Sequence, residues 1–193
     1  MKALTLILIF SILLVSCKNA EHEKEKTHQH KTEHKKETSK KKTLSPHTST
    51  MAMIGNAHIH IDYSSPGVRD RIIFGGLLAY DQVWQSGAHM ATWIETNKDL
   101  QIEGKTLPAG KYGFFTIPSK DEWIIIFNSN WEQHGKDEYD EKDDVIRFKV
   151  KPIFSEKIKE HLEYKVNEVD DTNGTISLAW EKVIIKFPFS IEN

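Results

Sequence analysis

In the stretch TMAMIGNAHIHIDYS, residues 50–64, polar and apolar residues alternate after a Gly55–Asn56 pair, and Met51 and Met53 stand two positions apart before it. In a strand, side chains two positions apart point to the same face, about 6.6 to 6.8 Å apart along the chain. The second half therefore has a polar face of His58, His60 and Asp62 and an apolar face of Ile59, Ile61 and Tyr63. We predict two paired strands, 50–55 and 57–64, with the apolar face of the second strand in the core.

Runs of the same kind fill the rest of the chain, and helical periodicity is nearly absent. The predicted strands are 50–55, 57–64, 91–97, 100–104, 111–118, 122–128, 145–152, 162–169, 174–180 and 182–189. One segment, SEKIKEH at 155–161, is instead predicted to form a short helix that Ser155 can cap. About ten strands predict an all-β domain, built as an antiparallel β-sandwich or a flattened barrel.

The first sixteen residues have the features of a secretory signal peptide, since Lys2 precedes an apolar run of fourteen residues, ALTLILIFSILLVS. A bilayer-spanning helix needs about 20 such residues, so the run predicts a cleaved signal and not an anchor helix. Cys17 follows in LVSC, which resembles the lipobox of bacterial lipoproteins, and it is the only cysteine. We predict that residues 1–16 are removed and that Cys17 is lipidated. A disulfide, thiol catalysis and a cysteine-based zinc site are then excluded.

Residues 17–43 are predicted to form a disordered tether behind this lipid. Positions 18–43 hold nine lysines, five glutamates and four histidines, and no apolar residue larger than alanine. The folded domain is then 44–193, with 16 basic and 23 acidic residues and a formal charge of −7. Such an acidic domain is a poor partner for nucleic acid. The expected partner is a membrane, reached through the lipid anchor, and the expected location is the cell envelope, at the outer membrane.

Four blocks of sequence carry a resemblance to a known family. They are YSSPGVRDRIIFGGLLAYDQVWQSGAHMAT (63–92), LPAGKYGFFTIPSKDEWIIIFN (107–128), YDEKDDVIRFKVKP (139–152) and LAWEKVIIKFPF (178–189). From Ser45 onward the chain resembles domain-of-unknown-function family 2911. The resemblance implies a β-rich envelope domain, secreted or lipid-anchored in Gram-negative bacteria, with no established reaction. Where the family commonly has Arg, Asn and Glu in its Trp-Arg-Thr-Gly-Ala-Asn-Glu-Ala-Thr motif, this chain has Gln85, His89 and Met90.

Histidines supply the candidate metal ligands. Two imidazoles on one strand face can converge on one ion with metal to nitrogen distances of about 2.0 to 2.1 Å. Further ligands come from GAHM and from NWEQHG, a loop after a core strand, so the predicted set is His58, His60, His89, Met90 and His134. Imidazole suits zinc and copper, and thioether sulfur selects for Cu(I). We therefore predict a transition-metal site, for copper as Cu(I) or Cu(II) before Zn(II).

Met51 and Met53 share one face of the strand that precedes these histidines, and two interpretations stay open for them. They either pack in the core or add sulfur to the metal site. The tether adds His22, His28, His30 and His34, which can collect metal only loosely because they lack preorganisation.

No local signature predicts an enzyme. The chain has no Gly-x-Ser-x-Gly elbow, and the acidic loop 137–144 lacks the spacing and turn glycine of a calcium loop. The main alternative is a non-enzymatic β-sandwich that binds a glycan or an envelope protein, with its histidines merely facing solvent. Trp84 and Trp131 are the tryptophans left for a stacking platform.

The remaining tryptophans, Trp93, Trp123 and Trp180, lie in strand runs and are predicted to pack in the core. Arg69 and Arg71 follow the Pro66–Gly67 turn, where they can either clamp an anion or pair with the acidic surface. Between these two, the sequence favours the ion pairs with surface carboxylates.

Overall fold

The structure is a computed structural model of the chain, and it describes residues 43–191. The predicted signal peptide, Cys17 and the predicted tether up to residue 42 lie outside these residues. The described residues lie in one compact unit, and the segment 41–193 that contains them is called the β domain below. Within 43–191, no helix has the length and apolarity that crossing a membrane requires.

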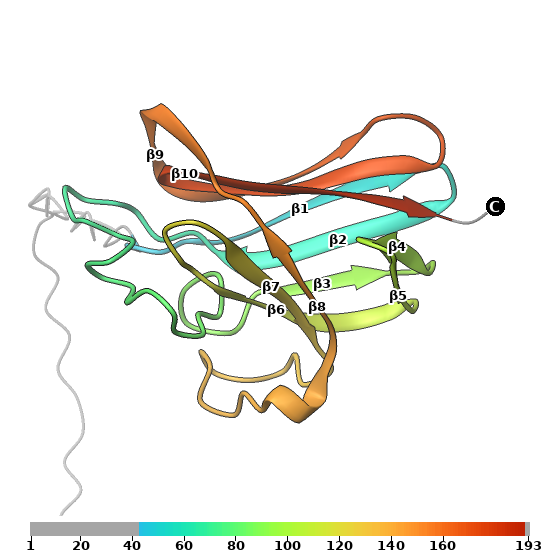
Figure 1. The fold of residues 1–193 in the computed structure, drawn as a ribbon, viewed down its shortest axis with the longest axis horizontal. Coiled ribbons are helices and arrows are strands. Elements are labelled where there is room, and N and C mark those ends of the chain that lie inside the picture. Colours follow the sequence, from blue (N-terminus) through green and yellow to red (C-terminus); the bar gives the residue numbers. More distant parts are fainter. Residues whose placement is uncertain (1–42, 192–193) are drawn as a thin grey trace, which may run out of the picture. The chain divides into compact units, whose positions relative to one another are not determined.

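The β domain is an antiparallel β-sandwich of ten strands, which confirms the predicted fold class and excludes a closed barrel (Figure 1). The strands are β1 His47–Ile54, β2 Ala57–Ser64, β3 Trp93–Thr96, β4 Leu100–Ile102, β5 Lys105–Leu107, β6 Gly110–Ile117, β7 Trp123–Asn128, β8 Asp144–Val150, β9 Ile153–Glu168 and β10 Asn173–Ile191. A single 3-10 turn, η1 Glu141–Asp143, precedes β8. One sheet has the order β1-β2-β3-β6-β7-β8 and the other β5-β4-β10-β9.

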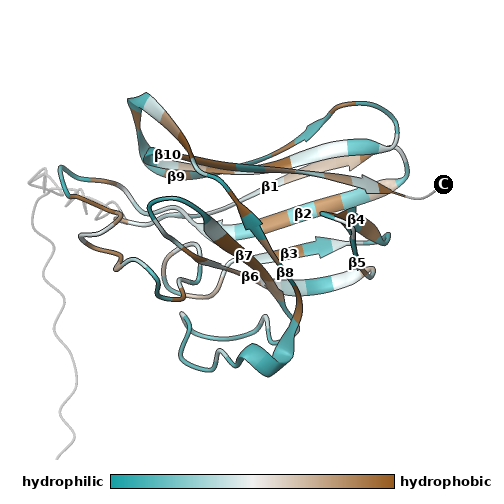
Figure 2. Cartoon of the chain, viewed as in Figure 1, coloured by the Kyte–Doolittle hydropathy of each residue, from teal (hydrophilic) through white to brown (hydrophobic). Residues whose placement is uncertain are grey.

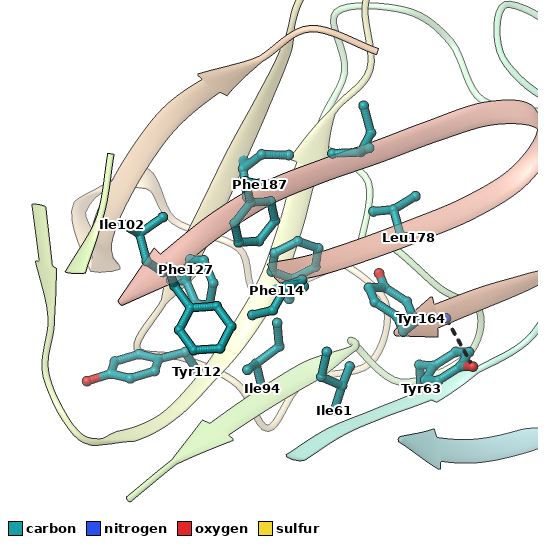
Figure 3. Close-up of a cluster of buried hydrophobic side chains, with 14 of the residues drawn as sticks. Ile61, Tyr63, Ile94, Ile102, Tyr112, Phe114, Phe127, Tyr164, Leu178 and Phe187 are labelled. Carbon is teal, nitrogen blue, oxygen red and sulfur yellow. Dashed lines mark hydrogen bonds between the residues drawn. The ribbon is translucent and has the colours of Figure 1, made fainter. Parts of the chain in front are cut away.

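The core lies between the two sheets, where aromatic and branched side chains from both sheets meet (Figure 3). Ile59 and Ile61 of β2 are fully buried and Tyr63 is nearly so, as the alternation in the sequence predicts. Along β2, hydrophilic and hydrophobic bands alternate in Figure 2. A hydrogen bond joins the sheets, since the Tyr164 backbone N–H donates to the Tyr63 hydroxyl oxygen at 3.2 Å. The polar face of β2 is thereby fixed on the outside of the sandwich.

The predicted helix at 155–161 is wrong, because these residues lie in β9. A helix of one or two turns makes few of its own hydrogen bonds and has an unfavourable nucleus. Pairing with β10 supplies the backbone partners instead, with Phe154 opposite Val183 and Lys159 opposite Glu181. The two predicted strands 174–180 and 182–189 are likewise one strand, β10, which a register shift at Glu181 interrupts without ending it.

The turn between β1 and β2 sets the register of the sheet edge. Gly55 has φ +53°, which glycine adopts without the steric penalty of a Cβ atom. A two-residue turn with glycine first is typical of tight hairpins. A Cβ at Gly55 would also overlap the backbone carbonyl oxygen of Asp171, which follows β9. The hairpin therefore lies directly against the β9–β10 connection.

Gly55→Ala is expected to lower the free energy of unfolding more than Gly104→Ala does. The expected difference is about 1 to 3 kcal/mol, because that is the usual cost of overpacking. Gly104 is the matched control, because its φ is +72° and no atom lies within 4 Å of a Cβ built there. Urea unfolding of both variants measures the difference. Equal losses would show that only the backbone conformation, and not the contact with Asp171, restricts position 55.

Candidate functional site

Two histidines and two methionines share the outer face of the β1–β2 hairpin. Met51 lies opposite His60 and Met53 opposite His58 in the antiparallel register. Directly opposed residues have their side chains on the same face, with Cβ atoms about 4.5 to 5.5 Å apart. Met51 is 59% exposed and Met53 is 53% exposed, so the interpretation that they pack in the core is wrong. These four residues are called the His–Met face.

The two imidazoles of this face are close enough to share an ion. Their ring centroids lie 6.2 Å apart, with the ring planes tilted by 46°. Two imidazoles that bind one ion at about 2.0 to 2.1 Å hold their centroids at most about 6.4 Å apart, since each ring adds about 1.1 Å. The backbone around His58 is fixed, because its N–H donates to the side-chain oxygen of Asn97 at 2.7 Å.

The His60 ring has an unusual environment for a residue on the outer face. Its edge-to-face partner is the Trp93 indole, with ring centroids 4.9 Å apart and an interplanar angle of 82°. The Nε2 atom of His60 is buried and has no hydrogen-bond partner in the described part of the chain. Buried polar atoms nearly always have a partner, and an unsatisfied one costs about 1 to 3 kcal/mol. This nitrogen is therefore the atom of the face that most lacks a ligand.

Trp93 is not in the core, so its predicted place is wrong. It is half-buried on the outer face, where Asp62 is its partner on β2. The Lys111 ammonium lies 3.5 Å from the centroid of a Trp93 ring and 3.7 Å from that of a Trp131 ring. An ammonium between two indoles is held by cation–π attraction. The two outer tryptophans thus hold the Lys111 ammonium between their rings.

The other sequence-predicted ligands lie elsewhere. Met90 forms a backbone bridge with His134, and the His89 carbonyl accepts a hydrogen bond from the Gly135 N–H at 2.7 Å. His134 is largely exposed and its Nδ1 lies 3.3 Å from an Asp137 oxygen. Among residues 43–191, no three side chains of His, Cys, Asp or Glu are grouped to hold a metal. Of the five predicted ligands, His58 thus lies near His60, and Met90 lies near His134. His89 lies apart from both pairs and lines a separate cavity.

His47 is a neighbour of the site that sequence reasoning did not assign. It begins β1, and its Nε2 lies 2.8 Å from an Asp62 carboxylate oxygen. A cavity of about 180 Å³ extends from this pair, with Met90, Trp93 and Trp131 also in its lining. Only the strand register, which pairs His47 with Ser64, brings His47 to this place. The signal for that register in the sequence was the Gly55–Asn56 turn.

The acidic loop before β8 has a structural role. The Asp144 carboxylate accepts hydrogen bonds from the Asn128 side-chain amide at 2.7 Å and from the Tyr139 hydroxyl at 2.9 Å. Burial raises the pKa of Asp144, and these two hydrogen bonds act against that rise. Burial also raises the pKa of Tyr139, and its hydrogen bond to Asp144 adds to the effect. Both groups hold the loop to the end of β7.

Comparison with known proteins supports the predicted resemblance. A family model described as a protein of unknown function, DUF2911, matches residues 45–189, which is about three quarters of the chain. No curated protein and no solved structure shows significant similarity to the chain. The match includes all of β1 to β9 and all of β10 except its last two residues, and the chain therefore belongs to the DUF2911 family of proteins of unknown function.

Proposed function

We propose that the β domain binds one Cu(I) ion on the His–Met face, through His58, His60, Met51 and Met53. The observation that carries the proposal is the buried His60 Nε2 without a partner, on a face where two thioethers lie opposite the two histidines. A bound ion removes the cost of that orphaned nitrogen. His89, Met90 and His134 are not part of this ligand set.

The ligand types favour copper over zinc. Zinc sites in proteins use histidine, cysteine and carboxylate ligands, whereas thioether sulfur selects for Cu(I). The exposed methionines supply two thioethers and the histidines two imidazoles. The 6.2 Å between the imidazole centroids fits a wide N–Cu–N angle of about 150°, with the thioethers as the further ligands. Trp93 covers one side of His60 and limits the access of water there.

Because the His–Met face is open to solvent, it favours scavenging copper or handing it to a partner over storing it in an enclosed site. Both methionines are more than half exposed, so a partner's ligands can approach the sulfur atoms from solvent. The face also includes the edge strand of its sheet, since β1 ends the strand order. No step of catalysis is needed for this role.

The proposal places the domain on a lipid anchor in the cell envelope, at the outer membrane. The supporting feature is the sequence LVSC that ends in Cys17, behind an apolar run of fourteen residues. The histidines of the tether would collect metal loosely and keep it near the domain. A flexible chain of 26 residues has a root-mean-square reach of about 28 Å, so the domain can meet partners clear of the lipid headgroups.

The test is a Cu(I) titration of the β domain, made without residues 1–40, against a competing Cu(I) chelator under anaerobic conditions. We expect one equivalent of Cu(I) to bind, with quenching of tryptophan fluorescence, because Trp93 lies against His60. Uptake that needs residues 1–40 would assign metal binding to the tether histidines and contradict the proposal.

A further inference from the structure

A second cavity lies between the loops that join β2 to β3 and the body of the sandwich. It has a volume of about 290 Å³, and its lining includes Arg69, Arg71, Trp84, Gln85, His89 and Trp180. None of the four residues of the His–Met face lines it. The loops that form it are the green segments after β2 in Figure 1. Its chemistry is therefore independent of the proposed copper site.

The cavity is positively charged in an acidic domain. In the described part of the chain, its lining holds two arginines and no aspartate or glutamate. The predicted pairing of these arginines with surface carboxylates is wrong, because neither guanidinium forms an ion pair within residues 43–191. Two cations that lack a counterion inside one cavity favour an anionic ligand.

Arg71 is held in place by the backbone. Its Nε donates to the Val68 carbonyl at 3.0 Å and its Nη2 to the Gly67 carbonyl at 2.6 Å. A guanidinium has five N–H donors in a fixed fork, so Nη1 keeps its donors for another acceptor. The nearby Glu160 carboxylate accepts from the Arg69 backbone N–H at 3.0 Å, and not from its guanidinium.

A buried indole supplies a further donor without a partner. Trp180 is 1% exposed, and its Nε1 is a buried polar atom that makes no hydrogen bond within residues 43–191. The Trp84 ring stacks on the Trp180 ring, with centroids 5.6 Å apart. Unlike the Trp180 nitrogen, the Trp84 Nε1 has a partner, because it donates to the Gly87 carbonyl. An indole nitrogen can only donate, so the group that satisfies Trp180 must be an acceptor.

The backbone around the cavity is strained. Arg69, Asp70, Ser86 and His89 have φ values of +50°, +56°, +54° and +64°. Residues other than glycine seldom adopt such values, and each costs on the order of 1 kcal/mol or more unless the surroundings enforce it. Such strain clusters at ligand sites, and here it is found in both segments that bring the arginines and His89 to the cavity.

We propose that this cavity binds a small organic carboxylate. Its carboxylate accepts hydrogen bonds from Arg69, the Nη1 side of Arg71 and the Trp180 indole, while its apolar part contacts Leu77 and Leu78. The volume is near the lower end of the range of about 300 to 1,000 Å³ that is usual for ligand sites, so the ligand is small. A monoanion with a planar head matches the fork of a guanidinium.

The test measures binding of benzoate, butyrate and acetate to the β domain by calorimetry, with uncharged benzamide and inorganic phosphate as comparisons. We use the β domain because it contains all ten strands and the core, and because the lysines of the tether would bind anions non-specifically. Benzoate is expected to bind about tenfold or more tightly than benzamide, since hydrogen bonds to a charged group contribute more than neutral ones.

Two variants test the assigned donors. Arg69→Gln and Trp180→Phe should each weaken benzoate binding about fivefold or more. Arg69 is exposed, so its replacement leaves folding intact even if Trp180→Phe disturbs packing. Lys111→Gln is the control, because it removes one positive charge outside the cavity and should change nothing. Equal binding of benzoate and benzamide, no loss in either variant, or no binding of any carboxylate would overturn the proposal. Binding of phosphate alone would overturn the assignment to carboxylates.

Discussion

Replacing both His58 and His60 with alanine is expected to lower the Cu(I) affinity of the β domain by more than about 100-fold. Loss of a residue that only orients a metal ligand already costs about 10- to 100-fold, so loss of two ligands exceeds that range. The His60 change also removes the orphaned nitrogen, so the free energy of unfolding of the apo domain should fall little. Competition with a Cu(I) chelator measures the affinity, and urea unfolding measures the stability.

His89→Ala and His134→Ala are the matched controls for this experiment. Both residues belong to the ligand set that the sequence predicts, but His89 lines the other cavity and His134 lies beside Asp137. We expect both variants to keep the Cu(I) affinity of the unmodified domain. A loss at His89 or His134 as large as that of the double variant would return these residues to the ligand set and refute the set proposed above.

Replacing Met51 and Met53 together with leucine is expected to weaken Cu(I) binding about tenfold or more and to leave Zn(II) binding nearly unchanged. Leucine has a similar volume but no sulfur, and thioether sulfur distinguishes Cu(I) from zinc. Both side chains are exposed, so the variant should fold as the unmodified domain does. Parallel titrations with Cu(I) and Zn(II) give the two affinities.

Met90→Leu is the control, because Met90 is similarly exposed but lies opposite His134 and outside the His–Met face. It should retain the preference for Cu(I). Equal losses of Cu(I) and Zn(II) in the Met51 and Met53 variant would mean that the methionines support the site without binding the metal.

Local periodicity made much of the fold predictable. The alternation in 57–64 was enough to assign His58 and His60 to the outer face, since the side chains of a strand alternate strictly. The Gly55–Asn56 turn predicted that the methionine strand pairs with the histidine strand. With a two-residue turn at 55–56, Met51 falls opposite His60, so the outward histidines imply outward methionines. The predicted strand 50–55 took Gly55 into the strand and concealed this register.

Features that depend on tertiary contacts were not predictable from the sequence. The segment 155–161 carries a helix cap and mixed polarity, but the partner strand β10 decides its structure. Trp93 lies in a strand run, but its register opposite Asp62 turns the indole outward to Lys111. The position of His89 depends on a long loop with several positive φ angles, which no periodic pattern describes. For this reason the predicted third ligand did not reach the histidine pair.

A Cu(I) titration of the β domain, with the end point examined by X-ray absorption at the copper edge, tests whether the His–Met face binds copper. The proposal predicts one bound Cu(I) whose ligands include both thioether sulfur and imidazole nitrogen. A copper ion with only nitrogen and oxygen ligands, or no uptake by the β domain, would contradict it.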